Sequence, residues 1–245
     1  MRDIKAIIEE IKYLHDNFGI NHFQFADELL MASEARTGEI CEAILNLPYA
    51  IKWDCNGRLN YAKEPLLKLM KKAGCEYINY GIESLDQKLL NDMNKGLTIE
   101  QIENGVKSTL EQGISPGLNL IWGFPGDTVE NLQAAVEFLK KYDPCDELRT
   151  IRPVTPYPGT QLYQKALDTG FLTGPDDFYE NKHVNSDLFT VNFMDISTEQ
   201  AHYFLKKANR ELYYSYLRKH FDQMCETTRR LYDFGDTSFR GFRAI

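Results

Sequence analysis

The sequence predicts an α/β protein built on parallel strands, and three observations carry this prediction. Apolar, strand-like runs alternate with helical stretches along the first two thirds of the chain. Several helical stretches end in glycine directly before the next strand, as at Gly19, Gly74 and Gly113. The alternation repeats about every 30 residues, which is typical of parallel strands joined by helical crossovers. We expect these crossovers to be right-handed.

The predicted elements follow one another in a regular order. Ile4, Ile7, Ile11 and Leu14 recur at helical spacing at the start of the chain. Helices are expected over 3–17, 33–46, 63–73, 86–93, 98–112, 128–141 and 159–169. Strands are expected over 20–26, 50–55, 75–81, 116–122 and about 147–153. A complete eightfold barrel needs about 250 residues, so these strands form either an open sheet or a partial barrel.

The C-terminal part of the chain has a different pattern. Residues 170–196 show few periodic apolar positions, and residues 197–234 predict one or two helices that begin at a capping sequence. The aromatic side chains along this stretch are typical of a helix that packs against a domain. We therefore divide the chain into a partial-barrel region, 1–169, and a C-terminal extension, 170–245.

Charge and hydropathy exclude several classes of protein. The net charge of −8 argues against general nucleic-acid binding, because phosphate contacts need a basic face. No stretch approaches about 18 uncharged apolar residues, so no membrane-spanning helix is expected. The first residues lack the apolar core and the cleavage site of a signal peptide, and a cytoplasmic location follows as the default.

The cysteines are widely spaced. They stand at positions 41, 55, 75, 145 and 225, with no Cys-x-x-Cys or other close pair. This spacing supports neither a disulfide framework nor a cluster or metal site built from neighbouring thiolates. The histidines show no metal-ligand spacing either, so no metal ligands are predicted in this chain.

Polar residues follow several of the predicted strands, at the edge where parallel α/β folds bind ligands. These strand ends contain Asp27, Glu28, Asn56, Arg58, Glu83, Ser84, Trp122 and Gly123. If the ends converge, they form one polar cleft with apolar walls. Asp27 and Glu28 are equally compatible with ligand binding and with the ordinary roles of a helix cap and a solvated acid. Arg58 is also compatible with a surface turn. Glu83 is expected to be an unpaired cleft carboxylate, because Ser84 or Asp86 suits the cap of the next helix better.

Four segments, in order over about residues 2–165, resemble the radical S-adenosylmethionine superfamily. They are Ile20-Asn-His-Phe-Gln-Phe-Ala-Asp-Glu28; Tyr77-Ile-Asn-Tyr-Gly-Ile-Glu-Ser84, followed by Met93-Asn-Lys-Gly-Leu-Thr98; Gly117-Leu-Asn-Leu-Ile-Trp-Gly-Phe-Pro-Gly-Asp-Thr-Val-Glu130; and Pro156-Tyr-Pro-Gly-Thr-Gln-Leu-Tyr163. The resemblance is strongest to the branch that often carries an N-terminal cobalamin-binding domain, and to methylthiotransferase-like members.

The resemblance implies a partial (β/α) barrel with a [4Fe–4S] cluster at its mouth. A Cys-x3-Cys-x2-Cys loop after the first strand holds the cluster, and an electron donor protein reduces it. The cluster cleaves S-adenosylmethionine to a 5′-deoxyadenosyl radical, which abstracts hydrogen from the substrate or supports methyl or methylthio transfer.

The family's cofactor contacts carry over to strand-end positions of this chain. Asp27 and Glu28 stand at the contact to the methionine amino group, and Arg58, beside Asn56, stands where it can pair with the methionine carboxylate. Glu83 and Ser84 stand near the ribose hydroxyls. Asn119 and the pair Trp122 and Gly123 stand near the adenine. No catalytic residue is assigned, and the substrate, small or macromolecular, is not readable.

The sequence departs from the family because it contains no Cys-x3-Cys-x2-Cys. Its matched region begins at the helix that should follow the cluster loop. We therefore expect a fragment, with the first strand and the loop upstream of Met1, that carries no cluster and is inactive alone. Two other functions stay open. One is a cluster-free barrel enzyme that uses Asp27 and Glu83 as acid and base, and the other is a non-catalytic binding module.

Overall fold

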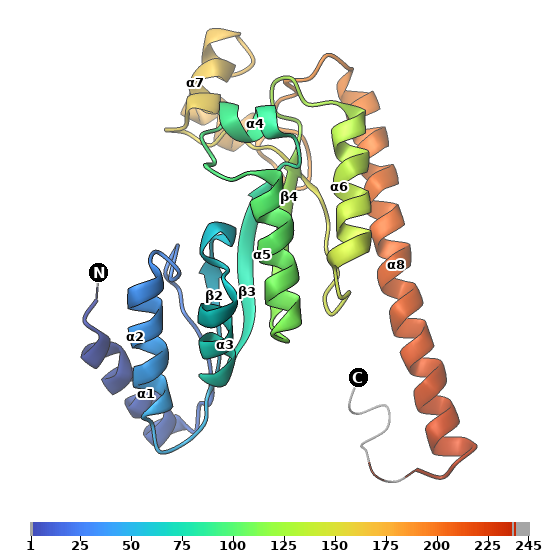
Figure 1. Ribbon diagram of the computed structural model, residues 1–245. Coiled ribbons are helices and arrows are strands. Elements are labelled where there is room, and N and C mark those ends of the chain that lie inside the picture. The colour runs from blue at the N-terminus through green and yellow to red at the C-terminus, as the bar shows by residue number, and fades with distance from the viewer. Residues whose placement is uncertain (1, 237, 239–245) are drawn as a thin grey trace. The chain divides into compact units, whose positions relative to one another are not determined.

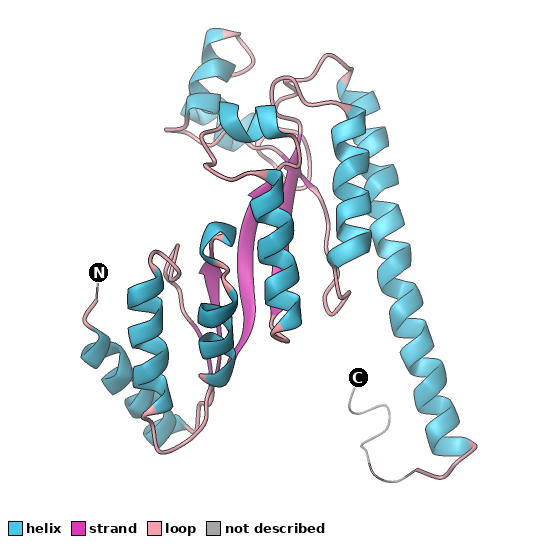
Figure 2. Ribbon diagram, viewed as in Figure 1, coloured by secondary structure: helices cyan, strands magenta, loops and turns pink. Residues whose placement is uncertain are grey.

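The computed structural model describes residues 2–236 and 238, and its two compact units divide between Asn131 and Leu132. The first unit contains parallel strands with helices between them, and the second is mainly helical (Figures 1 and 2). In the part of the chain that the structure describes, no helix is both long and apolar enough to cross a bilayer.

The first unit is built on four parallel strands in sequence order. These strands are β1 (His22–Gln24), β2 (Lys52–Gly57), β3 (Cys75–Glu83) and β4 (Ser115–Trp122), and each pairs with the next. Between them run α1 (Ile4–Phe18), α2 (Glu34–Leu45), the short 3-10 helix η1 (Leu59–Tyr61), α3 (Glu64–Lys72), α4 (Gln87–Asp92) and α5 (Ile99–Glu111). This arrangement confirms the α/β class and the partial barrel of parallel strands.

The two faces of this sheet differ in chemistry. One face is apolar and buried, with α3 packed on β3 and α5 packed on β4 (Figure 1). Its side chains are Trp53, Cys55, Ile78, Tyr80, Ile82, Leu118, Leu120 and Trp122. The opposite face, here called the inner face, carries Asp54, Asn56, Tyr77, Asn79 and Asn119, which are half-buried or exposed. Because successive residues of a strand point to opposite faces, the alternation of these strands produces one apolar and one polar surface.

The second unit contains most of α6 (Val129–Tyr142), the two-residue strand β5 (Arg152–Pro153), α7 (Gln161–Asp168), the π-helix η2 (Asp177–Lys182) and the long α8 (Thr198–Tyr232). One core cluster consists of Tyr163, Ala166, Leu172, Phe178 and Val191. The helix α8 begins at a capping box in which the Ser197 hydroxyl accepts the Gln200 N–H and the Gln200 side chain accepts the Ser197 N–H, as its sequence predicts.

The strand predicted at 147–153 is reduced to Arg152–Pro153. The backbone of Ile151 bonds instead to a side chain of α8: its N–H donates to Asn209 Oδ1 at 2.8 Å, and its C=O accepts from Asn209 Nδ2 at 2.9 Å. The proposed division of the chain at 169–170 stays a prediction. The last part of that extension, residues 237 and 239–245, lies outside the described residues.

Candidate functional site

Asparagine side chains form a hydrogen-bonded ladder across the inner face. Asn119 on β4 donates from Nδ2 to Asn79 Oδ1 on β3 at 2.7 Å, and Asn79 donates to Asn56 Oδ1 on β2 at 3.0 Å. Asn56 in turn donates to the backbone C=O of Asp27 at 3.0 Å. The ladder therefore brings together three of the predicted site residues, Asp27, Asn56 and Asn119.

The ladder has one direction. Each amide nitrogen donates toward β1, and the Tyr77 hydroxyl adds a second donor to Asn79 Oδ1 at 3.2 Å. The network thus sets which way each amide faces. Gly117 makes room for it, since a Cβ there would lie 2.3 Å from the Tyr77 hydroxyl and 2.5 Å from Asn79 Oδ1. Sequence reasoning missed Asn79, although an asparagine inside a strand is unusual enough to signal a special role.

Glu83 is not the unpaired carboxylate that the sequence analysis expected. Its Oε1 lies 2.9 Å from Lys95 Nζ, and the two side chains are only 25% and 23% exposed. The backbone of Glu83 is left-handed, with φ of 72°, at an irregularity in the β3–β4 register. The pair occupies the space over Gly81, where a Cβ would lie 2.5 Å from Glu83 Oε1. The inner face therefore ends in a half-buried ion pair.

Arg58 is tied to the same ion pair through the backbone. Its Nη2 donates to the C=O of Lys95 at 2.6 Å. Arg58 is thus half-buried and ordered rather than part of a solvated turn. Its pairing with a methionine carboxylate stays a prediction.

Several other predicted site residues make contacts within the fold. The Ser84 hydroxyl is buried and accepts the Asp86 N–H at 3.0 Å. The Trp122 indole N–H donates to the C=O of Thr128 at 2.8 Å. The Gly123 N–H donates to Asp127 Oδ2 at 2.9 Å. These contacts shape the ends of β3 and β4, and the cofactor roles of the three residues stay predictions.

Asp27 and Glu28 are exposed after the end of β1. Asp27 also lines a hollow of about 360 Å³ between α1 and β1, whose apolar wall includes Ile7, Ile11 and Phe23. The contact of these carboxylates with a methionine amino group stays a prediction.

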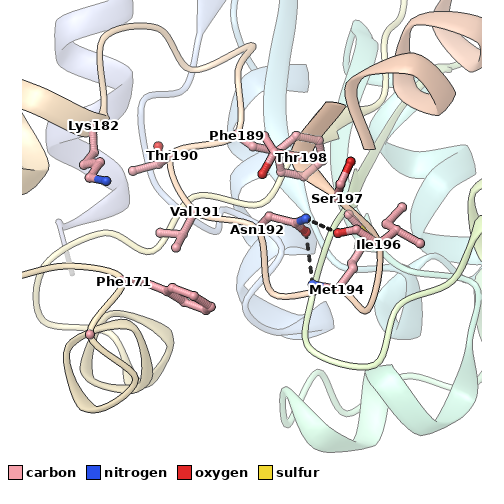
Figure 3. Close-up of a pocket in the computed structure, with 11 residues that line it drawn as sticks. Phe171, Lys182, Phe189, Thr190, Val191, Asn192, Met194, Ile196, Ser197 and Thr198 are labelled. Carbon is pink, nitrogen blue, oxygen red and sulfur yellow. Dashed lines mark hydrogen bonds between the residues drawn. The ribbon is translucent and has the colours of Figure 1, made fainter. Parts of the chain in front are cut away.

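A second hollow, of about 460 Å³, lies in the second unit away from every predicted site residue. Lys182 and Phe171 lie on one side of it (Figure 3). Asn192, on the other side, is used by its own loop: Nδ2 donates to the Ile196 C=O at 2.6 Å, and Oδ1 accepts the Met194 N–H at 3.0 Å (Figure 3). This hollow therefore belongs to the loop that leads into α8.

The thiols do not form a cluster site. Cys41, Cys55 and Cys75 are buried in the first unit, whereas Cys145 and Cys225 belong to the second. Burial raises the pKa of Cys41 to about 12. A hydrogen bond with Cys55, together with burial, raises the pKa of Cys75. Cluster ligation needs several thiolates brought together in space, and in the described residues no group of histidine, cysteine or acidic side chains could hold a metal ion.

Comparison with known proteins identifies the family. The model of the radical SAM superfamily matches residues 1–139, more than half of the chain. The chain belongs to this superfamily. The matched region contains the four parallel strands and the inner face with its asparagine ladder and ion pair.

The relatives include enzymes of methyl transfer and ring closure. An uncharacterised methyltransferase of Pyrococcus horikoshii is 33% identical over 69% of this chain and 36% of its own length. The anaerobic magnesium-protoporphyrin IX monomethyl ester cyclase of Cereibacter sphaeroides is 30% identical over 69% of this chain and 28% of its own length. The chain thus spans about a third of the length of these curated relatives.

Solved structures share the fold. The radical S-adenosylmethionine methyltransferase TsrM from Kitasatospora setae, with cobalamin and a [4Fe–4S] cluster bound, aligns with a TM-score of 0.59 and 22% identity. That alignment covers 71% of this chain and 36% of TsrM. The cobalamin-dependent enzyme OxsB aligns with a TM-score of 0.50 and 22% identity, over 68% of this chain and 24% of OxsB.

Proposed function

We propose that this chain is the S-adenosylmethionine-binding part of a radical SAM enzyme of the methyltransferase-like branch. The observation that carries the proposal is the inner face of the sheet. There, an ordered asparagine ladder and a half-buried carboxylate lie at the carboxyl side of parallel strands, in a chain of this superfamily. Bound S-adenosylmethionine supplies the group that is transferred or the radical that abstracts hydrogen.

The residues of the inner face fit the nucleoside half of this cofactor. A ribose presents two hydroxyl donors, and the Glu83 carboxylate has acceptor sites beyond the one that Lys95 uses. Asn119 donates to Asn79 through Nδ2, so its amide orientation is set and its Oδ1 is presented as an acceptor for the adenine amino group. Trp122 and Gly123 then shape the end of β4 beside the ring.

The amino-acid half would lie toward β1 and β2. Its ammonium suits the exposed carboxylates of Asp27 and Glu28. Its carboxylate suits the Arg58 guanidinium, which has donors beyond the one given to Lys95. These charges orient the cofactor along the strand ends, while the apolar face of the sheet keeps the strands in register.

The [4Fe–4S] cluster does not fit the thiols of this chain, so no step is assigned to it here. We propose that the cluster ligands, a cobalamin-binding domain and the docking site for an electron donor protein belong to other parts of the whole protein. The relatives named for methyl transfer support a transferase reaction, and the substrate stays open. A cytoplasmic location is part of the same proposal.

The test is binding of S-adenosylhomocysteine to the 245-residue chain by calorimetry. Glu83→Gln removes the charge that accepts the ribose hydroxyls, and a charge-assisted bond contributes about 1.5–3 kcal/mol. We expect the affinity to fall about ten- to a hundredfold. The matched control is Glu76→Gln, because Glu76 also lies on β3 and also pairs with a lysine, Lys52. Absence of binding by the wild-type chain, or equal losses in both variants, would contradict the proposal.

A further inference from the structure

Lys95 stands out because its ammonium reaches the end of the inner face from a turn outside the sheet. It follows α4 in the Asn94–Gly96 turn, whose flanking residues both have left-handed backbones, with φ of 52° at Asn94 and 66° at Gly96. Its partner Glu83 is also left-handed, with φ of 72°. Left-handed residues other than glycine are uncommon and are concentrated at functional sites.

Three residues from two neighbouring strand ends converge on this lysine. Arg58, after β2, holds its backbone C=O at 2.6 Å, and Glu83, at the end of β3, holds its ammonium at 2.9 Å. Gly81 leaves the space that the ammonium fills, since a Cβ there would lie 3.0 Å from Lys95 Nζ. The neighbouring Lys88 shows the ordinary alternative, because its side chain is 80% exposed and pairs with Asp92 one turn further along α4.

A half-buried ion pair contributes little net stability, because desolvation offsets most of the attraction. Folding alone therefore does not explain why the chain holds Lys95 against Glu83. Orientation does explain it. A glutamate side chain has three rotatable bonds, and a hydrogen bond to one oxygen leaves the second oxygen pointing in one direction.

We propose that Lys95 is a positioning residue that orients the Glu83 carboxylate for the two ribose hydroxyls of the bound nucleoside, with Arg58 holding Lys95 in place. This inference rests on the proposed function and gives Arg58 a second role, beside its proposed contact with the methionine carboxylate. Lys95 itself does not touch the ribose. It limits the Glu83 side chain to one rotamer, so that the carboxylate accepts the 2′-hydroxyl in a fixed direction.

The readout is discrimination between S-adenosylhomocysteine and its 2′-deoxy analogue, measured by calorimetry on the 245-residue chain. We expect the wild-type chain to bind the ribose form at least tenfold tighter. Lys95→Met should reduce this ratio to below about threefold, chiefly by weakening the ribose form. Lys95→Arg, which can also pair with a carboxylate, should restore most of the ratio. Lys88→Met removes the same charge from the same segment and should leave the ratio unchanged.

The outcomes separate this inference from the proposed function. If the wild-type chain binds neither nucleoside, the proposed function itself fails. If it binds both, and Lys95→Met weakens them equally while the ratio stays at the wild-type value, Lys95 is not a positioning residue. A melting curve of each variant identifies loss of folding. Should Lys95→Met fail to fold, Lys95→Gln gives the same ratio test with a smaller change.

Discussion

At the scale of single residues, Asp127 shows how one buried carboxylate organises the loop after β4. It is only 7% exposed, and it accepts the N–H groups of Gly123 and Thr128 and a side-chain N–H of Asn131. Burial raises the pKa of this carboxyl above its ordinary value, although the hydrogen bonds act in the opposite direction. The same loop carries Gly123, which is predicted to lie beside the adenine.

The raised pKa predicts a pH dependence of stability. The folded state holds the Asp127 proton more tightly than the unfolded chain does. The contribution of this group is therefore fully present below the ordinary aspartate pKa and is lost as pH rises through the raised value. Asp127→Asn has no proton to lose. We expect the variant to be less stable than the wild type at low pH, and this difference in stability to narrow as the pH rises above the ordinary aspartate pKa.

Urea unfolding at several pH values measures the difference in the free energy of unfolding between Asp127→Asn and the wild type. Asp222→Asn, on the exposed part of α8, is the control and should follow the wild type throughout. If the difference in stability between Asp127→Asn and the wild type widens with pH or does not change, burial does not dominate the pKa of Asp127.

The candidate site could be predicted only in part, because strand ends are visible in a sequence and long-range partners are not. Asn56, Asn119 and Glu83 lie on the inner face as their strand positions predict, and Asp27 meets the ladder through its backbone C=O. Lys95 was not predicted, since its partner lies twelve residues away across a helix, and only the three-dimensional turn brings the charges to 2.9 Å.

At the scale of elements, the segment before β5 and the helix α8 depend on one side chain. The Asn209 side chain hydrogen-bonds to both the N–H and the C=O of Ile151, which is only 1% exposed. This explains why the strand predicted at about 147–153 is shorter than expected: a helix side chain supplies the partners that a strand would have given Ile151, and only Arg152–Pro153 form β5. The other elements agree with their predictions to within a few residues, because helical periodicity and glycine ends are local signals.

Loss of that side chain should destabilise the second unit. Asn209→Ala leaves a buried N–H and a buried C=O without partners, at about 1–3 kcal/mol each. We expect the free energy of unfolding to fall by about 2–6 kcal/mol. Asn209→Asp keeps the acceptor and should lose less. Gln223→Ala, at an exposed position of the same helix, is the control. An Asn209→Ala variant within about 0.5 kcal/mol of the wild type would refute this role.

At the scale of the whole molecule, the chain combines the proposed nucleoside-binding face with cysteines that are widely spaced along the sequence. The net charge of −8 predicts that the molecule does not bind nucleic acids in general, because phosphate contacts need a basic face. The cysteines belong to two compact units, and the three in the first unit are buried in its core. Their burial, more than their number, decides what they can bind.

Anaerobic reconstitution with iron and sulfide should therefore give no stable [4Fe–4S] cluster on this chain. Burial raises the pKa of the Cys41 thiol, and a hydrogen bond with Cys55 together with burial raises that of Cys75, so both disfavour the thiolate that ligates iron. Cys145 is half-buried and Cys225 exposed, so any bound iron should be adventitious and should disappear in the Cys145→Ser, Cys225→Ser double variant. Iron and sulfide analysis with the absorption spectrum measures the outcome. About four irons per chain with a cluster absorption band, retained in the double variant, would mean that the buried thiols rearrange to bind a cluster.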